Sequence, residues 1–444
     1  MTRRVVVVGG GITGLAASWE ATGRGDEVRL LEASGRFGGL IRTSAVELDD
    51  GTAMVIDEAA DAFLARLPEA VGLCRELGLE DRFTQPAVGR AMVLSPDGPR
   101  WFPAGSVLGV PLDGDDLAAT GLLSEEGLAA VAAEAGRDDA PLTGDCSVGG
   151  FLRPRFGDEL VDRVVAPLVG GINAGDVDRM SLMAVTPQLA AAAAEGGSLT
   201  DELRRRAQDA PTGPVFLGLR DGTGTMVDRL VDRLGERGAE LCTDTPATTA
   251  DPDELDADLV VLTTPAAVAA RLLEGTSPGA ARDLSGIETA SVALATLVFD
   301  RRDVEVPDDA SGLLVPRDAG LFLAAASWGS TKWAHWDDGR HVVVRASAGH
   351  RGDQRVTTMD DDEVVAALLA DLRQAAGIDA APVGRRVSRW TDGFHQYDVG
   401  HLDLVDRVED RLRADTGDRV RVAGAAYRGL GIPACIRQGR AAAA

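Results

Sequence analysis

The stretch Arg4 to Glu32 reads RVVVVGGGITGLAASWEATGRGDEVRLLE and decides the fold of this chain. Four consecutive valines after two arginines predict a buried parallel strand, and the glycines at 9, 11 and 14 lead directly into a helical pattern. A second strand is predicted at 27–31 and ends on the acid Glu32. Strand, glycine turn, helix, strand and acid at this spacing predict a dinucleotide-binding βαβ unit.

Each residue type in this unit has a chemical reason. Gly9 makes the tight turn, Gly11 lets the backbone approach a pyrophosphate at the positive end of the helix, and Gly14 lets helix and strand pack closely. At the tip of the second strand, the Glu32 carboxylate can accept hydrogen bonds from ribose hydroxyls. An arginine at that position would instead indicate a 2′-phosphate.

The residues after Glu32 follow the pattern E-x-x-x-R-x-G-G-x-x-R-T, with Arg36, Gly38 and Gly39 at its centre. This pattern resembles the second fingerprint of the flavin-dependent amine oxidase and porphyrinogen oxidase superfamily. The resemblance implies that Arg36 and the two glycines lie along the diphosphate of FAD. Both parts of the N-terminal region therefore favour FAD over NAD as the cofactor.

Length and charge limit the classes of protein that fit. A chain of 444 residues is expected to form two or three domains, and its net charge of −25 argues against nucleic acid as a partner. Its apolar runs are far shorter than the roughly 18 residues of a membrane span, and no cleavable signal precedes the first strand. We expect a cytoplasmic protein, and peripheral membrane association and the oligomeric state are left open.

The basic residues are of an unusual kind. Lys332 is the only lysine among 45 basic residues, and aspartates recur in clusters. A salty cytosol would screen the self-repulsion of such a surface, whereas a high-GC genome would also favour arginine over lysine. Both explanations stay open.

No metal site is expected. The four cysteines show no CxxC spacing, so that neither a disulfide framework nor a zinc site is predicted. The histidines match no metal-ligand template either. They are His335, His341, His350, His395 and His401.

The end of the chain carries a second glycine-rich stretch, A-G-A-A-Y-R-G-L-G-I-P-A-C-I, at 423–436. It resembles the closing motif of the porphyrinogen oxidases, which implies that a helix begins here with its N-terminus aimed at the flavin. Such an N-terminus would stabilise negative charge on the ring. The resemblance implies that the cofactor-binding residues of this stretch are Gly424, Gly431, Ile432 and Pro433.

Further stretches resemble the FAD-dependent protoporphyrinogen and coproporphyrinogen oxidase family. They are the arginine opening a strand at 90, the glycine-rich segment at 167–176, S-W-G-S-T-K-W-A-H at 327–335 and R-A-S-A-G-H-R-G-D at 345–353. The chain departs from the family pattern at Ala59, Asn173 and His395. The substrate-binding residues that the resemblance implies are Arg90, Gly171, Gly175, Lys332 and Arg345.

The resemblance also implies a fold. We predict an α/β chain with a Rossmann-like FAD-binding domain, an antiparallel-sheet substrate domain and a helical insertion. The strands of the substrate domain include predicted segments at 290–299, 311–316, 321–327 and 341–347. The predicted domains are 1–50 with 211–285 and 386–444 for FAD, 51–110 with 286–385 for the substrate, and 111–210 for the insertion.

The implied reaction converts a porphyrinogen to a porphyrin in haem biosynthesis, by three two-electron hydride transfers to flavin N5. O2 reoxidises the flavin and H2O2 is released. The protein supplies orientation and electrostatics, so no catalytic side chain is expected. Coproporphyrinogen III and protoporphyrinogen IX both remain as substrates, and a ferrochelatase-type partner is left open.

Two other classes stay in play. A flavin amine or polyamine oxidase, or a carotenoid-desaturase-like oxidoreductase, would share the N-terminal fingerprint. An amine oxidase usually needs an aromatic cage, however, and the chain has only two tyrosines, Tyr397 and Tyr427. The second of these classes is a non-catalytic FAD-binding scaffold.

Overall fold

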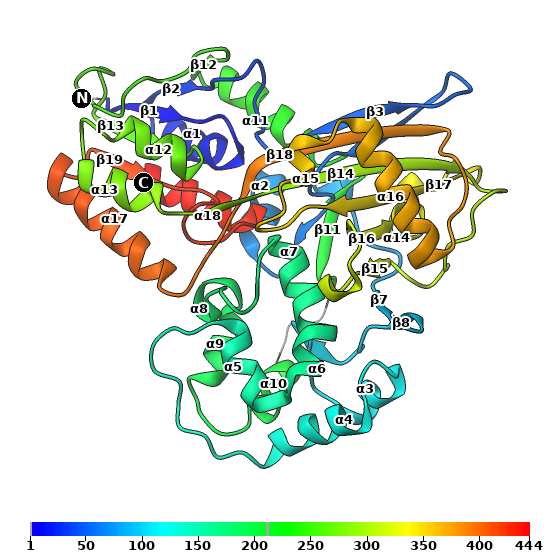
Figure 1. Cartoon of the computed structure of the whole chain (residues 1–444). Coiled ribbons are helices and arrows are strands. Elements are labelled where there is room, and N and C mark those ends of the chain that lie inside the picture. Colours follow the sequence, from blue (N-terminus) through cyan, green and yellow to red (C-terminus); the bar gives the residue numbers. More distant parts are fainter. Residues whose placement is uncertain (1, 210–212) are drawn as a thin grey trace.

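The computed structural model describes residues 2–209 and 213–444, and its N-terminal part is the predicted βαβ unit (Figure 1). Strand β1 is followed by helix α1 (Ile12–Gly23) and then by β2, which pairs with β1 in parallel. Further parallel strands extend the sheet to the order β12-β2-β1-β13-β19. Their bounds are Glu240–Cys242, Glu27–Leu31, Arg4–Val8, Leu259–Leu262 and Val420–Val422.

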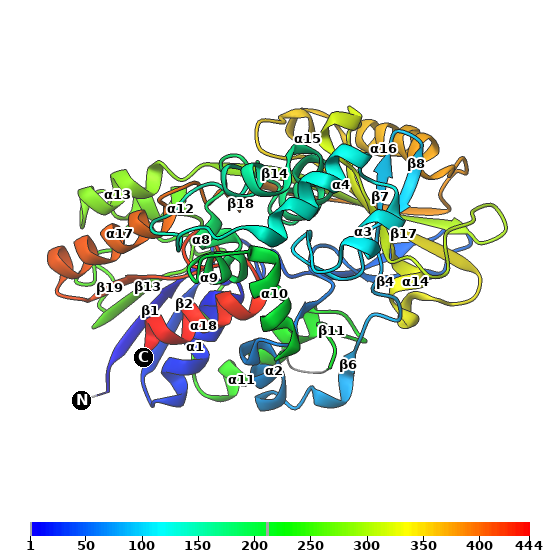
Figure 2. The same cartoon turned by 90° about the horizontal axis from the view of Figure 1, so that it is seen from below.

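Helices cover both faces of this parallel sheet, as the view from below shows (Figure 2). The buried valines at 5 and 7 pack on one face, and those at 6 and 8 on the other, because strand residues alternate between faces. One face is covered by α1, α2 (Pro68–Glu76), α11 (Gly224–Glu236) and α18 (Ile432–Ala443). The other face is covered by α12 (Ala266–Leu272), α13 (Pro278–Ser285) and α17 (His401–Thr416).

A seven-stranded sheet forms the second large unit, with the order β18-β14-β17-β16-β15-β7-β8. It is mixed and not purely antiparallel, because β15 and β7 pair in parallel. β7 belongs to a hairpin from much earlier in the chain, so no tight turn constrains its direction relative to β15. The bounds are Gly384–His395, Thr289–Asp300, His341–Ala348, Leu323–Trp328, Gly312–Leu314, Met92–Ser95 and Gly98–Trp101.

The two faces of this sheet differ in how well they are covered. Helix α16 (Asp361–Ala376) packs on one face, where side chains such as Val344 and Ala326 are buried. The opposite face carries small or aliphatic side chains that stay half-buried. They come from neighbouring positions on four strands, namely Leu294, Leu314, Ala325, Ser327 and Ser347. We call these five residues the sheet floor.

Residues 114–208 form the predicted helical part, which surrounds a core of its own. A ten-residue π-helical segment, Val161–Gly170, runs into α7 near the middle of the molecule in Figure 1. The predicted boundary between 210 and 211 lies outside the described residues. The α-helices here are Gly114–Thr120 (α3), Glu125–Ala132 (α4), Val148–Phe156 (α5), Asp158–Leu160 (α6), Gly171–Asn173 (α7), Leu182–Val185 (α8), Pro187–Ala193 (α9) and Leu199–Gln208 (α10).

Small elements connect these units. The hairpin β3 (Thr43–Glu47) and β4 (Ala53–Asp57) turns at Asp50-Gly51, a residue pair typical of hairpin turns. A three-stranded sheet joins β5 (Phe63–Leu64), β11 (Phe216–Leu219) and β6 (Phe83–Thr84). Another pair is β9 (Ser106–Val107) with β10 (Val110–Pro111).

Two segments lie in a different unit from the one predicted. Residues 386–395, predicted with the FAD-binding domain, form most of β18 and pair with β14 in the seven-stranded sheet. Helix α2, predicted with the substrate domain, buries Ala70 and Leu73 in the core around β1 and α1. Both differences arise from tertiary packing, because an amphipathic segment does not specify which apolar face will cover it. In residues 2–209 and 213–444, no helix is long and apolar enough to cross a membrane.

Candidate functional site

The predicted glycines at the carboxyl end of β1 form a tight backbone turn. Gly9 has φ of +106°, and the Thr263 hydroxyl donates to its carbonyl oxygen at 2.7 Å. A Cβ on Gly14 would lie 1.9 Å from the same oxygen, so no larger residue fits there. This close contact is the helix-to-strand packing expected of the third glycine in the motif.

The second fingerprint lies against the first. Gly38 N–H donates to the Gly10 carbonyl oxygen at 2.7 Å, and Gly11 forms a bridge with Gly38. A Cβ on Gly39 would lie 3.1 Å from the Gly11 Cα, whereas a Cβ on Gly11 would meet only Gly39, at 3.9 Å. The two glycine segments therefore form one cradle of partly exposed backbone beside the start of α1.

The cradle suits a diphosphate. Helix α1 begins after Gly11 with no side-chain cap, so its first N–H groups are available to an anion at the positive end of the helix dipole. Arg36 lies beside them and donates to the carbonyl oxygens of Phe37 and Gly39. Its pKa is lowered, first by burial and then by the nearby Arg42, so a negatively charged ligand would be favoured there.

Glu32 lies at the tip of β2, as predicted, and is held by its neighbours. Its carboxylate accepts from the Gly10 N–H at 2.7 Å and from the N–H and hydroxyl of Ser34 at 2.8 and 2.7 Å. A carboxylate offers about four acceptor positions. One remains for a ribose hydroxyl, and the predicted ribose contact stays a prediction.

The closing motif lies next to the same helix. A Cβ on Gly424 would come within 3.4 Å of the Thr13 hydroxyl oxygen, and α18 begins after Gly431 with Pro433 in its first turn and no side-chain cap. The helix predicted to begin in this stretch is confirmed, and it begins at Ile432. Cys435 is buried, which raises the pKa of its thiol to about 11, so a nucleophilic role is disfavoured.

On the substrate side, Lys332 and Arg345 meet at a carboxylate that was not among the predicted site residues. Asp61 accepts from Lys332 Nζ at 3.0 and 3.2 Å, from Trp333 Nε1 at 2.9 Å and pairs with Arg345 Nη1 at 2.8 Å. Burial alone would raise the pKa of Asp61, but the charges of Lys332 and Arg345 outweigh it and lower the pKa to about 2. The cluster of Asp61, Lys332 and Arg345 carries one net positive charge.

A second buried carboxylate stands beside this cluster. Asp57, at the end of β4, accepts from the Thr43 hydroxyl at 2.6 Å and from the N–H and hydroxyl of Thr223 at 2.8 and 2.9 Å. Burial raises the pKa of its carboxyl group. These bonds join the β3–β4 hairpin to the start of α11. In the sequence, both acids belong to the stretch D-E-A-A-D-A-F at 57–63, which was the available signal for them because it partly resembles the family pattern.

Gly171 and Gly175 bound a short loop in which the carbonyl oxygens of residues 173–175 are held from outside. Gln396 Nε2 donates to the Asn173 oxygen at 3.2 Å, the Arg351 N–H donates to the Ala174 oxygen at 2.8 Å, and Arg317 Nη2 donates to the Gly175 oxygen at 2.5 Å. The neighbouring Ile172 is 59% exposed. The loop of residues 171–175 thus presents an aliphatic side chain from a tightly held backbone.

Arg90 lies apart from these groups. Its guanidinium stacks over the ring of Trp101 at 4.1 Å, and Trp101 packs against the cluster under α16. That cluster covers the face of the sheet opposite the sheet floor. The substrate-binding role of Arg90 stays a prediction, and this placement weighs against it.

The departures from the family pattern have local explanations. His395 Nε2 accepts from the Ala266 N–H at 3.2 Å at the start of α12, and burial, with the neighbouring His401, lowers the His395 pKa to about 4. Asn173 donates to the Val169 carbonyl oxygen at 2.8 Å and so stays within its own helix. The Ala59 carbonyl oxygen accepts from Arg345.

The family model described as flavin containing amine oxidoreductase matches residues 12–444. The chain belongs to this family. It is 32% identical to coproporphyrinogen III oxidase of Bacillus subtilis, over 99% of this chain and 97% of that protein, and 35% identical to the Mycobacterium leprae protein of the same name, over 98% and 96%. A crystal structure from Exiguobacterium sp. 255-15 matches with TM-score 0.87 at 31% identity, covering 99% of this chain and 98% of that one.

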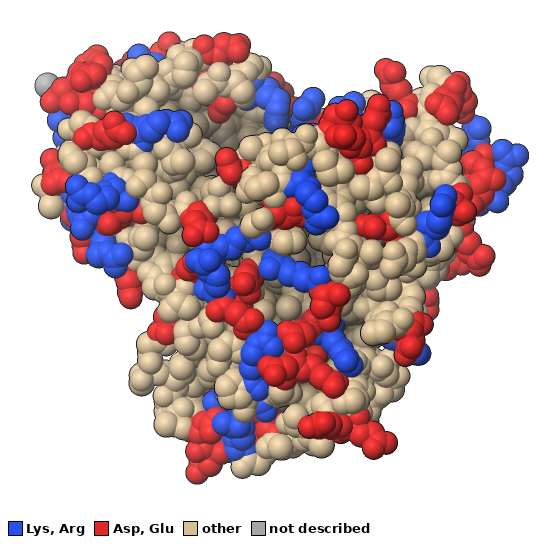
Figure 3. Space-filling model, in the orientation of Figure 1, with Lys and Arg blue, Asp and Glu red and all other residues tan. Residues whose placement is uncertain are grey.

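Membership of the flavin containing amine oxidoreductases confirms the predicted fold class and the predicted FAD. The glycine cradle, the uncapped start of α1 and Arg36 are the residues that would hold its diphosphate. Between the units, the face shown in Figure 3 is hollowed near its middle, and both basic and acidic side chains lie around the hollow. The assignment of single residues to cofactor or substrate remains a proposal.

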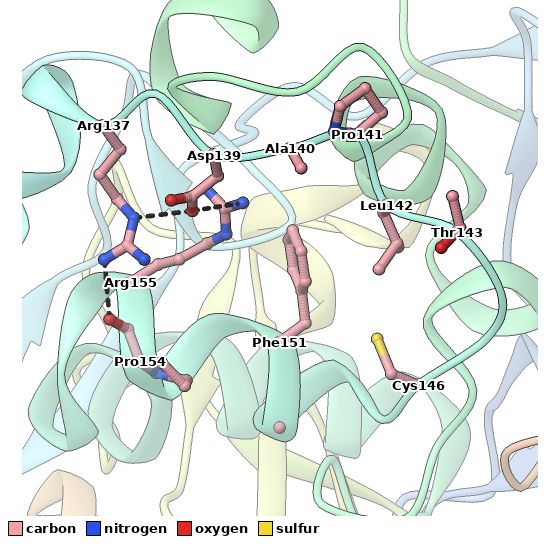
Figure 4. A pocket seen from close by; sticks show the side chains of 11 residues that line it. Arg137, Asp139, Ala140, Pro141, Leu142, Thr143, Cys146, Phe151, Pro154 and Arg155 are labelled. Atoms are coloured by element: carbon pink, nitrogen blue, oxygen red, sulfur yellow. Dashed lines mark hydrogen bonds and ion pairs between the residues drawn. The ribbon is translucent and has the colours of Figure 1, made fainter.

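A separate depression of about 420 Å³ lies in the helical part, lined by Phe151 and Pro141 among others (Figure 4). Asp139 accepts from Arg137 at 2.8 Å and pairs with Arg155 at 2.8 Å, and Arg155 also reaches the buried Glu134. These carboxylates neutralise both arginines, which leaves little attraction for an anion. Across the described ranges, no group of three or more potential metal ligands is found.

Proposed function

We propose that the chain is an FAD-dependent oxidase that converts coproporphyrinogen III to coproporphyrin III in haem biosynthesis. The observation that carries this proposal is the sheet floor. Three of its five side chains are Ala or Ser, all five are half-buried, and it ends at the positively charged Lys332 and Arg345. A tetrapyrrole with carboxylate substituents suits such a surface, since its apolar body can lie on the floor while its carboxylates meet the cations.

The choice of coproporphyrinogen III over protoporphyrinogen IX is supported by the names of the relatives at 32 to 35% identity. FAD, when bound, would supply the hydride acceptor for the oxidation, with O2 as the final electron acceptor. The chain's own residues bind and orient. The cradle and Arg36 would position the diphosphate, and the cluster of Asp61, Lys332 and Arg345 would attract a substrate carboxylate.

An amine oxidase is supported less well. Tyr397 is buried, donates to the Ala425 carbonyl oxygen at 2.8 Å and stacks on His401 with ring centroids 3.9 Å apart. Tyr427 is also buried, at 1% exposure. Neither tyrosine is therefore available to form an open aromatic cage for a substrate amine.

The direct test is incubation of the FAD-loaded protein with coproporphyrinogen III under air, with porphyrin fluorescence and H2O2 as readouts. Heat-denatured protein with free FAD measures spontaneous oxidation, and a polyamine tested in parallel measures amine oxidation. We expect porphyrin and H2O2 from the porphyrinogen alone. Porphyrin formation at the spontaneous rate, or H2O2 from the polyamine, would reject the proposal. The cytoplasmic location, peripheral membrane association and a ferrochelatase-type partner stay predictions.

A further inference from the structure

The sheet floor has cations at both of its ends. At one end, Lys332 follows β16, and Arg345 lies on β17 opposite Ser327. At the other end, Arg317 follows β15, in the short turn Arg317–Ala319. Because β15 and β16 are antiparallel, the end of β15 lies beside the start of β16, and so opposite the Lys332 end. A ligand on the floor would therefore meet positive charge on two opposite sides.

Arg317 is held in place but leaves most of its donors unused. Its Nη2 donates to the Gly175 carbonyl oxygen at 2.5 Å, which ties it to the loop of residues 171–175. No ion pair between Arg317 and a carboxylate occurs in the part of the chain that the structure describes, and the nearest charge acting on it is Asp176. Since a guanidinium has five N–H donors in a planar fork, enough remain for a bidentate carboxylate.

The surroundings of Arg317 favour an anion. Arg317 is exposed, and the protein atoms around it still desolvate its guanidinium enough to lower the pKa, so a bound anion would stabilise the charged form. Ile172, three residues before the Gly175 that Arg317 contacts, is exposed and offers an aliphatic side chain from the same segment. Arg317 thus combines an accessible fork, a fixed position and an apolar neighbour, whereas Lys332 and Arg345 already share the Asp61 carboxylate.

The separation of the two ends discriminates between substrates. Gly312 is level with Arg345 in the sheet, because both are register partners of Ser327, and from Gly312 to Arg317 the chain advances five residues, or at most about 17 Å. Coproporphyrinogen III carries a propionate on each of its four pyrroles and so has carboxylates on opposite edges. Protoporphyrinogen IX carries only two, on neighbouring pyrroles, and cannot reach both ends at once.

We propose that Arg317 binds a substrate carboxylate at the end of the floor opposite Lys332 and Arg345, and that this contact selects the tetracarboxylate over the dicarboxylate. The inference rests on the proposed function and deepens it by naming a specificity-determining residue. Arg317 makes no contact that would give it a part in hydride transfer. Its loss should therefore weaken binding and leave turnover largely intact.

The test compares Arg317→Gln with wild type on both substrates. The readouts are KM and kcat with each porphyrinogen, and the Kd of coproporphyrin III and of protoporphyrin IX measured by quenching of tryptophan fluorescence. We expect KM and Kd for the tetracarboxylate to rise about tenfold or more, and values for the dicarboxylate to change less than about threefold. The KM and Kd of Arg317→Lys for the tetracarboxylate should lie between those of wild type and Arg317→Gln, because lysine keeps the charge and loses the planar fork.

Arg407→Gln is the matched control, since Arg407 is an exposed arginine on α17, away from the floor. FAD content and thermal midpoint should be unchanged in every variant. Equal weakening of both porphyrins, or a lowered thermal midpoint without a change in Kd, would show that Arg317 only holds the Gly175 loop. If wild type oxidises neither porphyrinogen and binds neither porphyrin, the proposed function fails as well. If wild type is active and Arg317→Gln matches it, only this inference fails.

Discussion

Asp61 is the residue on which the buried charges of the substrate side depend. It accepts from both Lys332 and Arg345, and the pKa of its carboxyl is lowered from 3.8 to about 2. A carboxyl group whose pKa is lower in the folded than in the unfolded chain stabilises the fold at any pH above its unfolded pKa. This contribution is lost as the pH falls from about 4 to about 2. The shift corresponds to about 2 kcal/mol. Urea unfolding at pH 5 and pH 3 should show this loss in wild type.

Asp61→Asn should remove that pH dependence and lower stability outright. Two cations would then share one buried site without a carboxylate, which typically costs about 3 to 5 kcal/mol. Asp201→Asn is the control, because Asp201 pairs with Arg204 on the exposed surface of α10, where such pairs contribute little. Equal stability losses in the two variants would show that the Asp61 cluster is not a special site.

Glu32 tests the cofactor side. Glu32→Ala removes a carboxylate that binds the Gly10 N–H and leaves no acceptor for a ribose hydroxyl. We expect FAD to bind more weakly by about 1.5 to 3 kcal/mol, the usual value of hydrogen bonds to a charged acceptor. Titration of the apoprotein with FAD, followed by flavin fluorescence, measures this. An unchanged Kd would mean that the ribose lies elsewhere, and Glu32→Gln should show a smaller loss.

At the scale of secondary-structure elements, the contact between α1 and α18 depends on a glycine. A Cβ on Gly439 would lie 2.2 Å from the Thr13 carbonyl oxygen, so Gly439→Ala should force the helices apart and cost about 1 to 3 kcal/mol. Gly235 in α11 has no atom within 4 Å of such a Cβ. Gly235→Ala should therefore stabilise by about 0.4 to 1 kcal/mol. Chemical denaturation should show that the free energy of unfolding falls in Gly439→Ala and rises in Gly235→Ala. A change in the same direction in both variants would contradict the close packing of α1 on α18.

The start of α12 depends on a neutral histidine at the end of β18. His395 accepts from the Ala266 N–H, and burial lowers its pKa from 6.5 to about 4. Stability that is present above pH 6.5 should be lost as the pH falls to about 4, by about 3 kcal/mol. In His395→Gln an amide oxygen can accept the same bond without titrating. The free energy of unfolding is measured against pH for wild type and for His395→Gln, and the difference between the two curves isolates the titration of His395. Parallel curves would rule this effect out.

For the whole molecule, the net charge of −25 is expected to oppose folding at low salt. The Debye length falls from about 10 Å at 0.1 M salt to about 3 Å at 1 M, so added KCl should screen this repulsion. We expect the thermal midpoint to rise with KCl and most of the rise to occur below 1 M. A midpoint that does not change would favour the genomic explanation of the arginine-rich composition. Sucrose at matched concentration controls for general solute effects.

The βαβ unit, the glycine cradle, the β3–β4 hairpin and the start of α18 could all be predicted from the sequence. Each depends on contacts between residues close along the chain or on a backbone geometry that only glycine adopts, as at Gly9 and Gly14. Local patterns specify such features because the atoms involved are brought together by the turn itself. Alternating or apolar stretches of sequence likewise indicated most strands of the large sheet. They did not indicate the parallel pairing of β15 with β7.

Only the tertiary structure decided which charges neutralise one another and which face of a sheet stays open. Asp61 meets Lys332 across 271 positions, and Arg317 meets Gly175 across 142. No local pattern reports such a contact, so Lys332 and Arg345 were predicted without their shared carboxylate and Arg317 was not singled out. The placement of Arg90 over Trp101, of α2 in the FAD-binding core and of residues 386–395 in the large sheet has the same cause. Several side chains or apolar faces in the sequence could serve as the partner of each of these groups. Only packing between segments that are distant in the chain determines which of them does.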